Sequence, residues 1–158
     1  MPKIAPFLTY NDQAEEAVNL YVSILKNSRV ISLNRYPDEV PGLGGKAMSI
    51  NFVLDGQELI ALNGGPHFTF TDGFSLLANC ETQAEVDDLW AKLTADGGEP
   101  GQCGWLKDKF GLSWQIIPTA LGQLLGDPDP RKSQSVMQAM LQMTRIDIAA
   151  LRRAYDQG

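Results

Sequence analysis

An internal repeat is the feature that most constrains how this chain can fold. Pro6–Tyr21 (PFLTYNDQAEEAVNLY) and Ser75–Trp90 (SLLANCETQAEVDDLW) begin with an apolar run and end in a helical pattern that closes with leucine and an aromatic residue. A second matching pair follows, because Asp55–Asn63 and Phe110–Pro118 each place a glycine before a strand-like run. The Pro- and Gly-rich stretch Tyr36–Lys46 has no counterpart in the second copy, and it is predicted to be a long loop.

Each copy is predicted to fold as a strand, a helix and then three strands. Both helical patterns begin with capping-box spacing, Asp12 with Glu15 in the first copy and Thr82 with Glu85 in the second. Apolar and β-branched residues in the later runs favour strands. The predicted elements are Ile4–Tyr10, Ala14–Leu25, Arg29–Arg35, Lys46–Leu54 and Glu58–Asn63 in the first copy, and Phe74–Cys80, Gln83–Thr94, Glu99–Cys103, Gly104–Asp108 and Leu112–Ile117 in the second.

A helical segment is predicted after Pro118. Asp129 followed by Pro130 suits a helix N-cap with proline in the first helical position. A second short helix is expected within TRIDIAALRRAY. Residues 1–158 are therefore expected to form a single domain, with one module at 3–65, another at 73–118 and a C-terminal helical segment at 119–158.

The first helix of that segment carries an apolar stripe. Val136, Met140 and Met143 fall on one helical face, and Met137 and Leu141 lie beside it. Such a stripe is expected to pack on the back of the sheet or on a partner subunit.

Composition and charge exclude several classes of partner. The net charge is −6 and the isoelectric point is about 4.7, whereas nucleic acids and anionic membranes require basic patches. No apolar run approaches the roughly 18 residues of a membrane span, and MPKIAPFLTY lacks the pattern of a signal peptide. The two cysteines, Cys80 and Cys103, form neither a disulfide framework nor a CxxC pair. A cytoplasmic protein with reduced thiols is expected.

The doubled module resembles the vicinal oxygen chelate superfamily, which includes glyoxalase I, bleomycin-resistance proteins and ring-cleaving dioxygenases. Within that superfamily the chain resembles the PhnB-like family, which is also labelled demethylubiquinone methyltransferase-like. The resemblance lies in three segments: FLTYNDQAEEAVNLYVSILKNSRV, LNGGPHFTFTDGFSLLANCET, and GQCGWLKDKFGLSWQIIP with the later LLGDPDP. The resemblance covers nearly the whole chain. It implies an α+β fold with paired βαβββ modules of the glyoxalase/bleomycin resistance type, each curling into half a cup, in a homodimer.

The resemblance also implies four positions at which superfamily enzymes hold a divalent metal ion. Counted from the helix aromatics and the strand glycines, these positions carry Pro6, Ile60, Ser75 and Gln115. Proline and isoleucine cannot ligate through their side chains, and serine is a poor ligand. Since one neutral amide does not hold a transition metal, no metal ion is predicted at this site.

No cofactor is expected either. The sequence GLGGKA (Gly42–Ala47) matches the weak G-x-G-x-x-A pattern, but Pro41 precedes it and a strand-like run follows. That pattern needs a strand before the glycines and a helix N-terminus after them to face a phosphate. For the same reason the methyltransferase label is doubtful, because no doubly wound pattern is present to hold S-adenosylmethionine. Cys103 is expected to be a small buried thiol, because no base is placed beside it.

A cavity remains in this fold without a metal, and alternation along the strands predicts its lining. His67, the only histidine, falls on the connector between the modules, where it is an ordinary loop residue or a group offered to a ligand at the mouth of the cup. The predicted pocket residues are Tyr10, Ile60, Leu62, His67, Ser75, Leu77, Ser113 and Gln115. The alternative is that such side chains simply fill the space as core.

The sequence therefore predicts a homodimeric protein that binds a small organic molecule without a metal ion. The alternative is an enzyme of the same superfamily that acts on a small metabolite. Spacing places no acid–base pair and no nucleophile–base pair, so the sequence leaves the choice open and favours binding.

Overall fold

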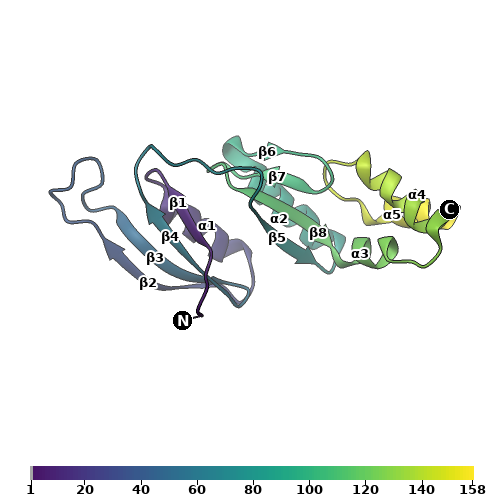
Figure 1. Ribbon diagram of the computed structural model, residues 1–158, viewed down its shortest axis with the longest axis horizontal. Coiled ribbons are helices and arrows are strands. Elements are labelled where there is room, and N and C mark those ends of the chain that lie inside the picture. Colours follow the sequence, from purple (N-terminus) through teal and green to yellow (C-terminus); the bar gives the residue numbers. More distant parts are fainter. Residues whose placement is uncertain (1) are drawn as a thin grey trace. The chain divides into compact units, whose positions relative to one another are not determined.

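The computed structural model describes residues 2–158, which divide into two compact units with a boundary between Thr69 and Phe70. Each unit holds one four-stranded sheet with a helix on one face (Figure 1). The first unit contains β1 (Phe7–Tyr10), α1 (Ala14–Ile24), β2 (Arg29–Arg35), β3 (Ala47–Leu54) and β4 (Gln57–Asn63). The second contains β5 (Ser75–Cys80), α2 (Gln83–Thr94), a 3₁₀ turn (Ala95–Gly97), β6 (Glu99–Pro100), β7 (Trp105–Lys107), β8 (Ser113–Pro118), α3 (Thr119–Leu125), α4 (Pro130–Leu141) and α5 (Ile148–Gln157).

The two sheets have the same topology. Their strand orders are β1-β4-β3-β2 and β5-β8-β7-β6, and in each the first strand pairs with the last in parallel while the other pairs are antiparallel. The predicted βαβββ repeat, the α+β class and the C-terminal helices are therefore confirmed. The predicted β6 was too long, because the chain turns at residues 101–104 and Cys103 adopts a positive φ of 59°.

Each sheet buries the face that packs against its helix. In the first unit Leu8 and Tyr10 of β1 are buried beside Ala17 and Tyr21 of α1, and the two tyrosine hydroxyls lie 3.0 Å apart. In the second unit Trp114 and Ile116 of β8 are buried on the side of α2. Because side chains alternate along a strand, the residues between them face the opposite side of each sheet, which we call the open face.

The two helices after the first strands begin differently. Thr82 caps α2 as predicted, since its Oγ1 accepts a hydrogen bond from the Glu85 N–H at 3.2 Å. The capping box predicted for α1 is wrong: the Asp12 carboxylate pairs with Lys46 at 3.1 Å. Instead, Oδ1 of the buried Asn63 accepts from the N–H of Ala14, the first residue of α1, at 2.8 Å.

The C-terminal helices form a small hydrophobic core in the second unit. The N-cap at Asp129 is confirmed, because its carboxylate accepts from the Arg131 N–H at 2.9 Å. Val136, Met140 and Met143 of the predicted apolar stripe pack with α3 and α5, whereas Met137 and Leu141 stay exposed. Packing of the exposed pair on a partner subunit stays a prediction. Helix α3 was not predicted. The core consists of Leu121, Val136, Ile146 and Leu151, with Ile117, Leu124, Leu125, Met140, Met143 and Tyr155 against it.

Helices long and apolar enough to span a bilayer do not occur within residues 2–158.

Candidate functional site

The open face of the second sheet brings together four of the predicted pocket residues. Ser75 lies beside Ser113 and Leu77 beside Gln115 in the parallel β5–β8 pair, so their side chains point to the same side. Ser113 is buried, whereas Leu77 is about half exposed. The Gln115 Nε2 donates a hydrogen bond to the Ser75 Oγ at 3.0 Å, which fixes the orientation of the amide.

Strand β7 extends this face with two further residues. Trp105 pairs with Gln115 and Lys107 with Ser113, so both side chains lie on the open face. Sequence reasoning missed Trp105, although it is 37% exposed and large. The alternation of Trp105, buried Leu106 and Lys107 was the available signal.

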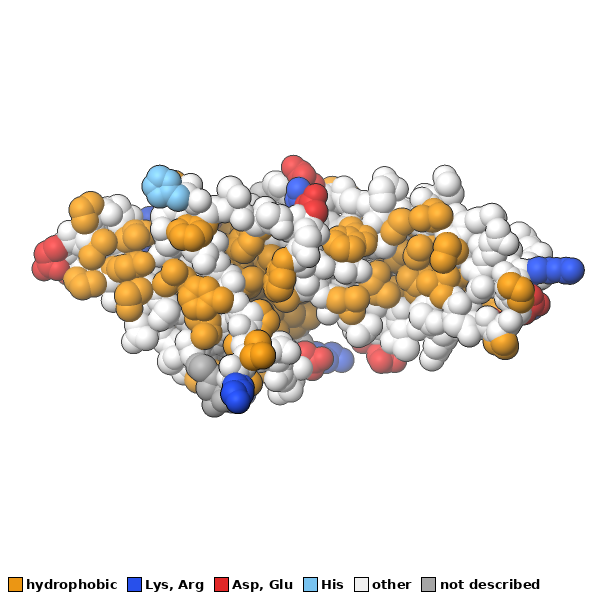
Figure 2. All heavy atoms as spheres, in the orientation of Figure 1, with side chains coloured by type: hydrophobic (Ala, Val, Ile, Leu, Met, Phe, Trp, Pro, Cys, Tyr) orange, Lys and Arg blue, Asp and Glu red, His pale blue; other side chains and the backbone are white. Residues whose placement is uncertain are grey.

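A depression of about 340 Å³ lies at one end of this face, where the sheet meets the C-terminal helices. Most of its walls are apolar, and hydrophobic side chains gather over β8, α3 and α4 in Figure 2. Its lining comes from three sources, the sheet, the turn before β7 and helices α3 and α4: Leu77, Cys103, Trp105, Gln115, Ile117, Leu121, Gly122, Leu125 and Met140. We call this the apolar depression.

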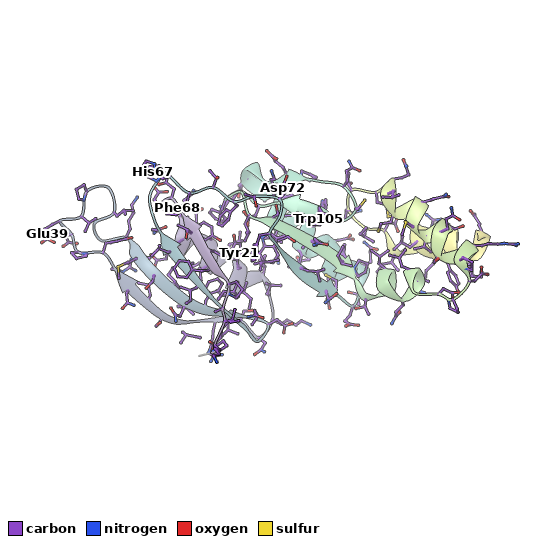
Figure 3. The ribbon with its side chains drawn as sticks, viewed as in Figure 1. Tyr21, Glu39, His67, Phe68, Asp72 and Trp105 are labelled. Atoms are coloured by element: carbon purple, nitrogen blue, oxygen red, sulfur yellow. The ribbon has the colours of Figure 1, made fainter. Side chains whose placement is uncertain are left out.

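A second depression of about 260 Å³ shares Trp105 with the first, but it is charged. The Lys107 ammonium lies 3.1 Å from the Asp72 carboxylate, and Glu99 contributes to the same lining. Figure 3 shows Asp72 and Trp105 in the second unit. The Asp72 and Lys107 side chains are 74% and 46% exposed, so water screens this ion pair.

In the first unit the predicted pocket residues separate onto two faces. Ile60 and Leu62 are half-buried on the open face, where Phe7 and Thr9 are their neighbours in register. Tyr10 lies on the opposite face with its hydroxyl against Tyr21, so the prediction that it shares a face with Ile60 and Leu62 is wrong.

His67 lies in an exposed turn between β4 and β5, beside Phe68 (Figure 3). The prediction that it stays outside regular strand is confirmed. It is not among the residues that line either depression. Its contribution to a ligand stays a prediction.

Replacing His67 with alanine is expected to change the free energy of unfolding by less than about 1 kcal/mol, because surface substitutions are usually small in effect. Thermal unfolding followed by circular dichroism measures the change. A loss of several kcal/mol would show that the imidazole makes a buried contact.

The four positions at which superfamily enzymes hold a metal ion carry side chains with few donor atoms in this chain. In the first unit the Ile60 N–H donates a hydrogen bond to the Pro6 carbonyl at 3.0 Å. In the second unit the Gln115 Nε2 donates to the Ser75 Oγ at 3.0 Å, so the positions pair with each other within each unit. Their side chains offer only one hydroxyl and one amide, which do not fit a divalent transition metal. Within the described part of the chain, no three His, Cys, Asp or Glu residues are grouped to hold a metal ion.

The two thiols differ in environment. Cys80 is fully buried, and burial raises the pKa of its thiol to about 11. Cys103 is half-buried in the lining of the apolar depression. Because the thiolate is the reactive form, Cys80 is expected to resist modification in the folded protein.

At pH 8 a disulfide reagent such as Ellman's is expected to modify Cys103 in the native protein and Cys80 only after unfolding, because about one Cys80 in a thousand would be ionised. Counting released thiolate with and without denaturant measures this. A Cys103→Ser variant serves as the control, and rapid native reaction in that variant would contradict the assignment.

Comparison with models of known protein families assigns the chain to one family. A family model described as 3-demethylubiquinone-9 3-methyltransferase matches residues 2–117. The chain belongs to this family. The predicted relationship to PhnB-like proteins is confirmed. The region that matches the family ends within β8, so α3, α4 and α5 lie beyond it.

Three solved structures are similar to this chain. A PhnB protein from Bacillus cereus, described with the same methyltransferase name, is 35% identical with a TM-score of 0.70, over 75% of this chain and 100% of that chain. The protein PA1353 from Pseudomonas aeruginosa is 21% identical with a TM-score of 0.60, over 75% and 98%. The fosfomycin resistance protein FosX from Listeria monocytogenes, solved with Mn(II) and sulfate, is 15% identical with a TM-score of 0.50, over 75% and 91%. None of the curated proteins matches the chain.

Proposed function

We propose that this chain binds a small organic molecule on the open face of its second sheet, without a metal ion. The observation that carries the proposal is the apolar depression, which has about 340 Å³ and a single amide among mostly apolar walls. Small-molecule sites usually have this size and this combination of apolar lining with few polar groups.

Three side chains of the sheet have separate roles in this proposal. The exposed Trp105 indole offers a flat surface for stacking. Gln115 supplies the polar contact, and Ser75 holds its amide in place at 3.0 Å. A ligand that hydrogen-bonds to Gln115 is thereby oriented relative to Trp105, since both residues lie in register on adjacent strands.

The proposal is binding rather than methyl transfer. A methyltransferase name describes the family model, but the glycines of Gly42–Ala47 lie in turns that lead into strand β3, with no helix start after them. A phosphate- or nucleotide-type cradle at a helix N-terminus is therefore not formed there. The residues around the apolar depression provide contacts for a ligand.

A fragment screen by ligand-observed NMR tests the proposal. Uncharged small aromatic molecules are expected to bind the wild-type protein, in the presence of a chelator, and to lose binding in a Trp105→Ala, Gln115→Leu double variant. The matched control is Asn34→Leu on the exposed strand β2 of the first unit. Hits that persist unchanged in the double variant, or the absence of any hit, would contradict the proposed site.

We also propose that the protein is a cytoplasmic homodimer, as its free thiols and the family resemblance suggest. Sedimentation at micromolar concentration is expected to give about twice the chain mass of 17.3 kDa. The exposed Met137 and Leu141 of α4 are available to an interface, whereas the buried Val136 is not. A clean monomer at that concentration would contradict the dimer.

A further inference from the structure

We infer that helices α3 and α4 form one wall of the apolar depression and restrict it to uncharged aromatic molecules. The inference rests on the proposed function, and it assigns ligand selection to the part of the chain outside the family match. Leu121, Gly122 and Leu125 of α3 and Met140 of α4 belong to the lining. The family model ends at residue 117, before all four.

The wall is held at a fixed distance from the sheet. Helix α3 follows β8 directly, at Thr119. At the far end of α4, the Met143 and Thr144 carbonyls accept hydrogen bonds from the Cys103 and Gly104 N–H groups at 2.8 and 2.7 Å. These bonds tie the end of α4 to the turn before β7, which itself lines the depression through Cys103.

A third attachment comes from α2. The Gln83 side chain donates through Nε2 to the Ile146 carbonyl at 2.9 Å and accepts through Oε1 from the Ile148 N–H at 2.8 Å. These hydrogen bonds attach the segment between α4 and α5, and the first residue of α5, to the helix α2 that packs on the sheet. The wall is thus anchored before α3 and after α4, and its side chains cannot withdraw freely from the depression.

The chemistry of the lining selects the ligand. Asp, Glu, Lys, Arg and His are all absent from the residues that line the apolar depression, so a charged ligand would lose hydration without gaining a partner. Trp105 stacks with aromatic rings, and the Met140 thioether makes favourable contacts with them. With Nε2 of Gln115 engaged by Ser75, Oε1 is the acceptor available for a hydroxyl or N–H group of the ligand.

Gly122 allows the wall to be altered without disturbing the fold. A Cβ atom at this position would meet no heavy atom within 4 Å, although the glycine lines the depression. A side chain added there therefore starts in open space beside the depression. Replacing glycine inside a helix also favours the helical state, so the variant is expected to remain folded.

Calorimetry with 2-naphthol, an uncharged two-ring phenol, tests the inference. We expect it to bind the wild-type protein and to bind Gly122→Leu at least about tenfold more weakly, with Gly122→Ala between them. Gln123→Leu adds the same side chain one residue later on α3, where the residue is exposed, and is expected to bind like the wild type. Naphthalene-2-sulfonate is expected to bind the wild type at least about tenfold more weakly than 2-naphthol.

Two results would overturn the inference while leaving the proposed function intact. One is that Gly122→Leu and the wild-type protein bind 2-naphthol with equal affinity, while Trp105→Ala does not bind it. The other is equal affinity for the phenol and the sulfonate. If instead no fragment depends on Trp105 and Gln115, the proposed function itself fails. Thermal unfolding of each Gly122 variant is expected to show no loss of stability. If Gly122→Leu does not fold, the weaker binding expected for Gly122→Ala tests the inference in its place.

Discussion

Replacing Asn63 with leucine is expected to lower the free energy of unfolding of the first unit by about 3 kcal/mol. Asn63 ends β4 and is only 1% exposed. Its Oδ1 accepts from the Ala14 N–H and its Nδ2 donates to the Ala47 carbonyl, both at 2.8 Å. Leucine has a similar size but cannot make either bond, so a buried donor and a buried acceptor would lose their partner.

Chemical denaturation followed by circular dichroism measures this loss, because all three tryptophans lie in the second unit. Asn34→Leu introduces the same change on exposed strand β2 and is expected to cost under about 0.5 kcal/mol. A cost for Asn63→Leu no larger than that of the control would show that the helix start does not depend on this amide.

Replacing Asp108 with alanine is expected to destabilise the second unit by about 3 kcal/mol. Asp108 is 2% exposed and sits in the turn between β7 and β8. Its Oδ1 accepts from the Phe110 and Leu112 N–H groups at 2.9 and 3.1 Å, and its Oδ2 accepts from the Trp114 indole N–H at 3.0 Å. Removing the carboxylate deletes the hydrogen-bond acceptor of two backbone N–H groups and one indole N–H group.

Tryptophan fluorescence during denaturation follows this unit. Asp108→Asn retains one acceptor oxygen and is expected to lose less stability than Asp108→Ala. Asp88→Ala on α2 removes an exposed carboxylate from the same unit, where its ion pair with Lys92 is worth under about 1 kcal/mol. Similar losses for Asp108→Ala and Asp88→Ala would rule out the anchoring role of Asp108.

The repeat made the fold predictable because its signals are local. Apolar runs, turn glycines and the Thr82 cap act over a few residues, and both modules follow from them. The start of α1 was not predictable in this way, because its cap comes from Asn63, which lies 49 residues away in sequence from Ala14. At the matching position of the second copy stands Pro118, whose side chain has no atom that can accept a hydrogen bond from the start of α2, and the Thr82 side chain caps that helix instead.

The candidate site was predictable only where alternation was unambiguous. On β5 and β8 one face is clearly buried, and Ser75, Leu77, Ser113 and Gln115 were placed together correctly. In β1 the sequence FLTY puts apolar residues on both faces, so alternation could not decide which side Tyr10 takes. Helix α3 is short and contains a glycine, and its role in the depression depends on tertiary packing that no local pattern reports.

An NMR titration of the isotopically labelled protein with a fragment hit, with a chelator present, tests whether the open face of the second sheet binds a ligand without a metal ion. We expect the largest chemical-shift changes at the Trp105 indole N–H and the Gln115 side-chain amide, with smaller changes along β5 and α3. Shifts centred on the helix-covered face of either sheet, or binding that appears only after a divalent metal is added, would contradict this expectation.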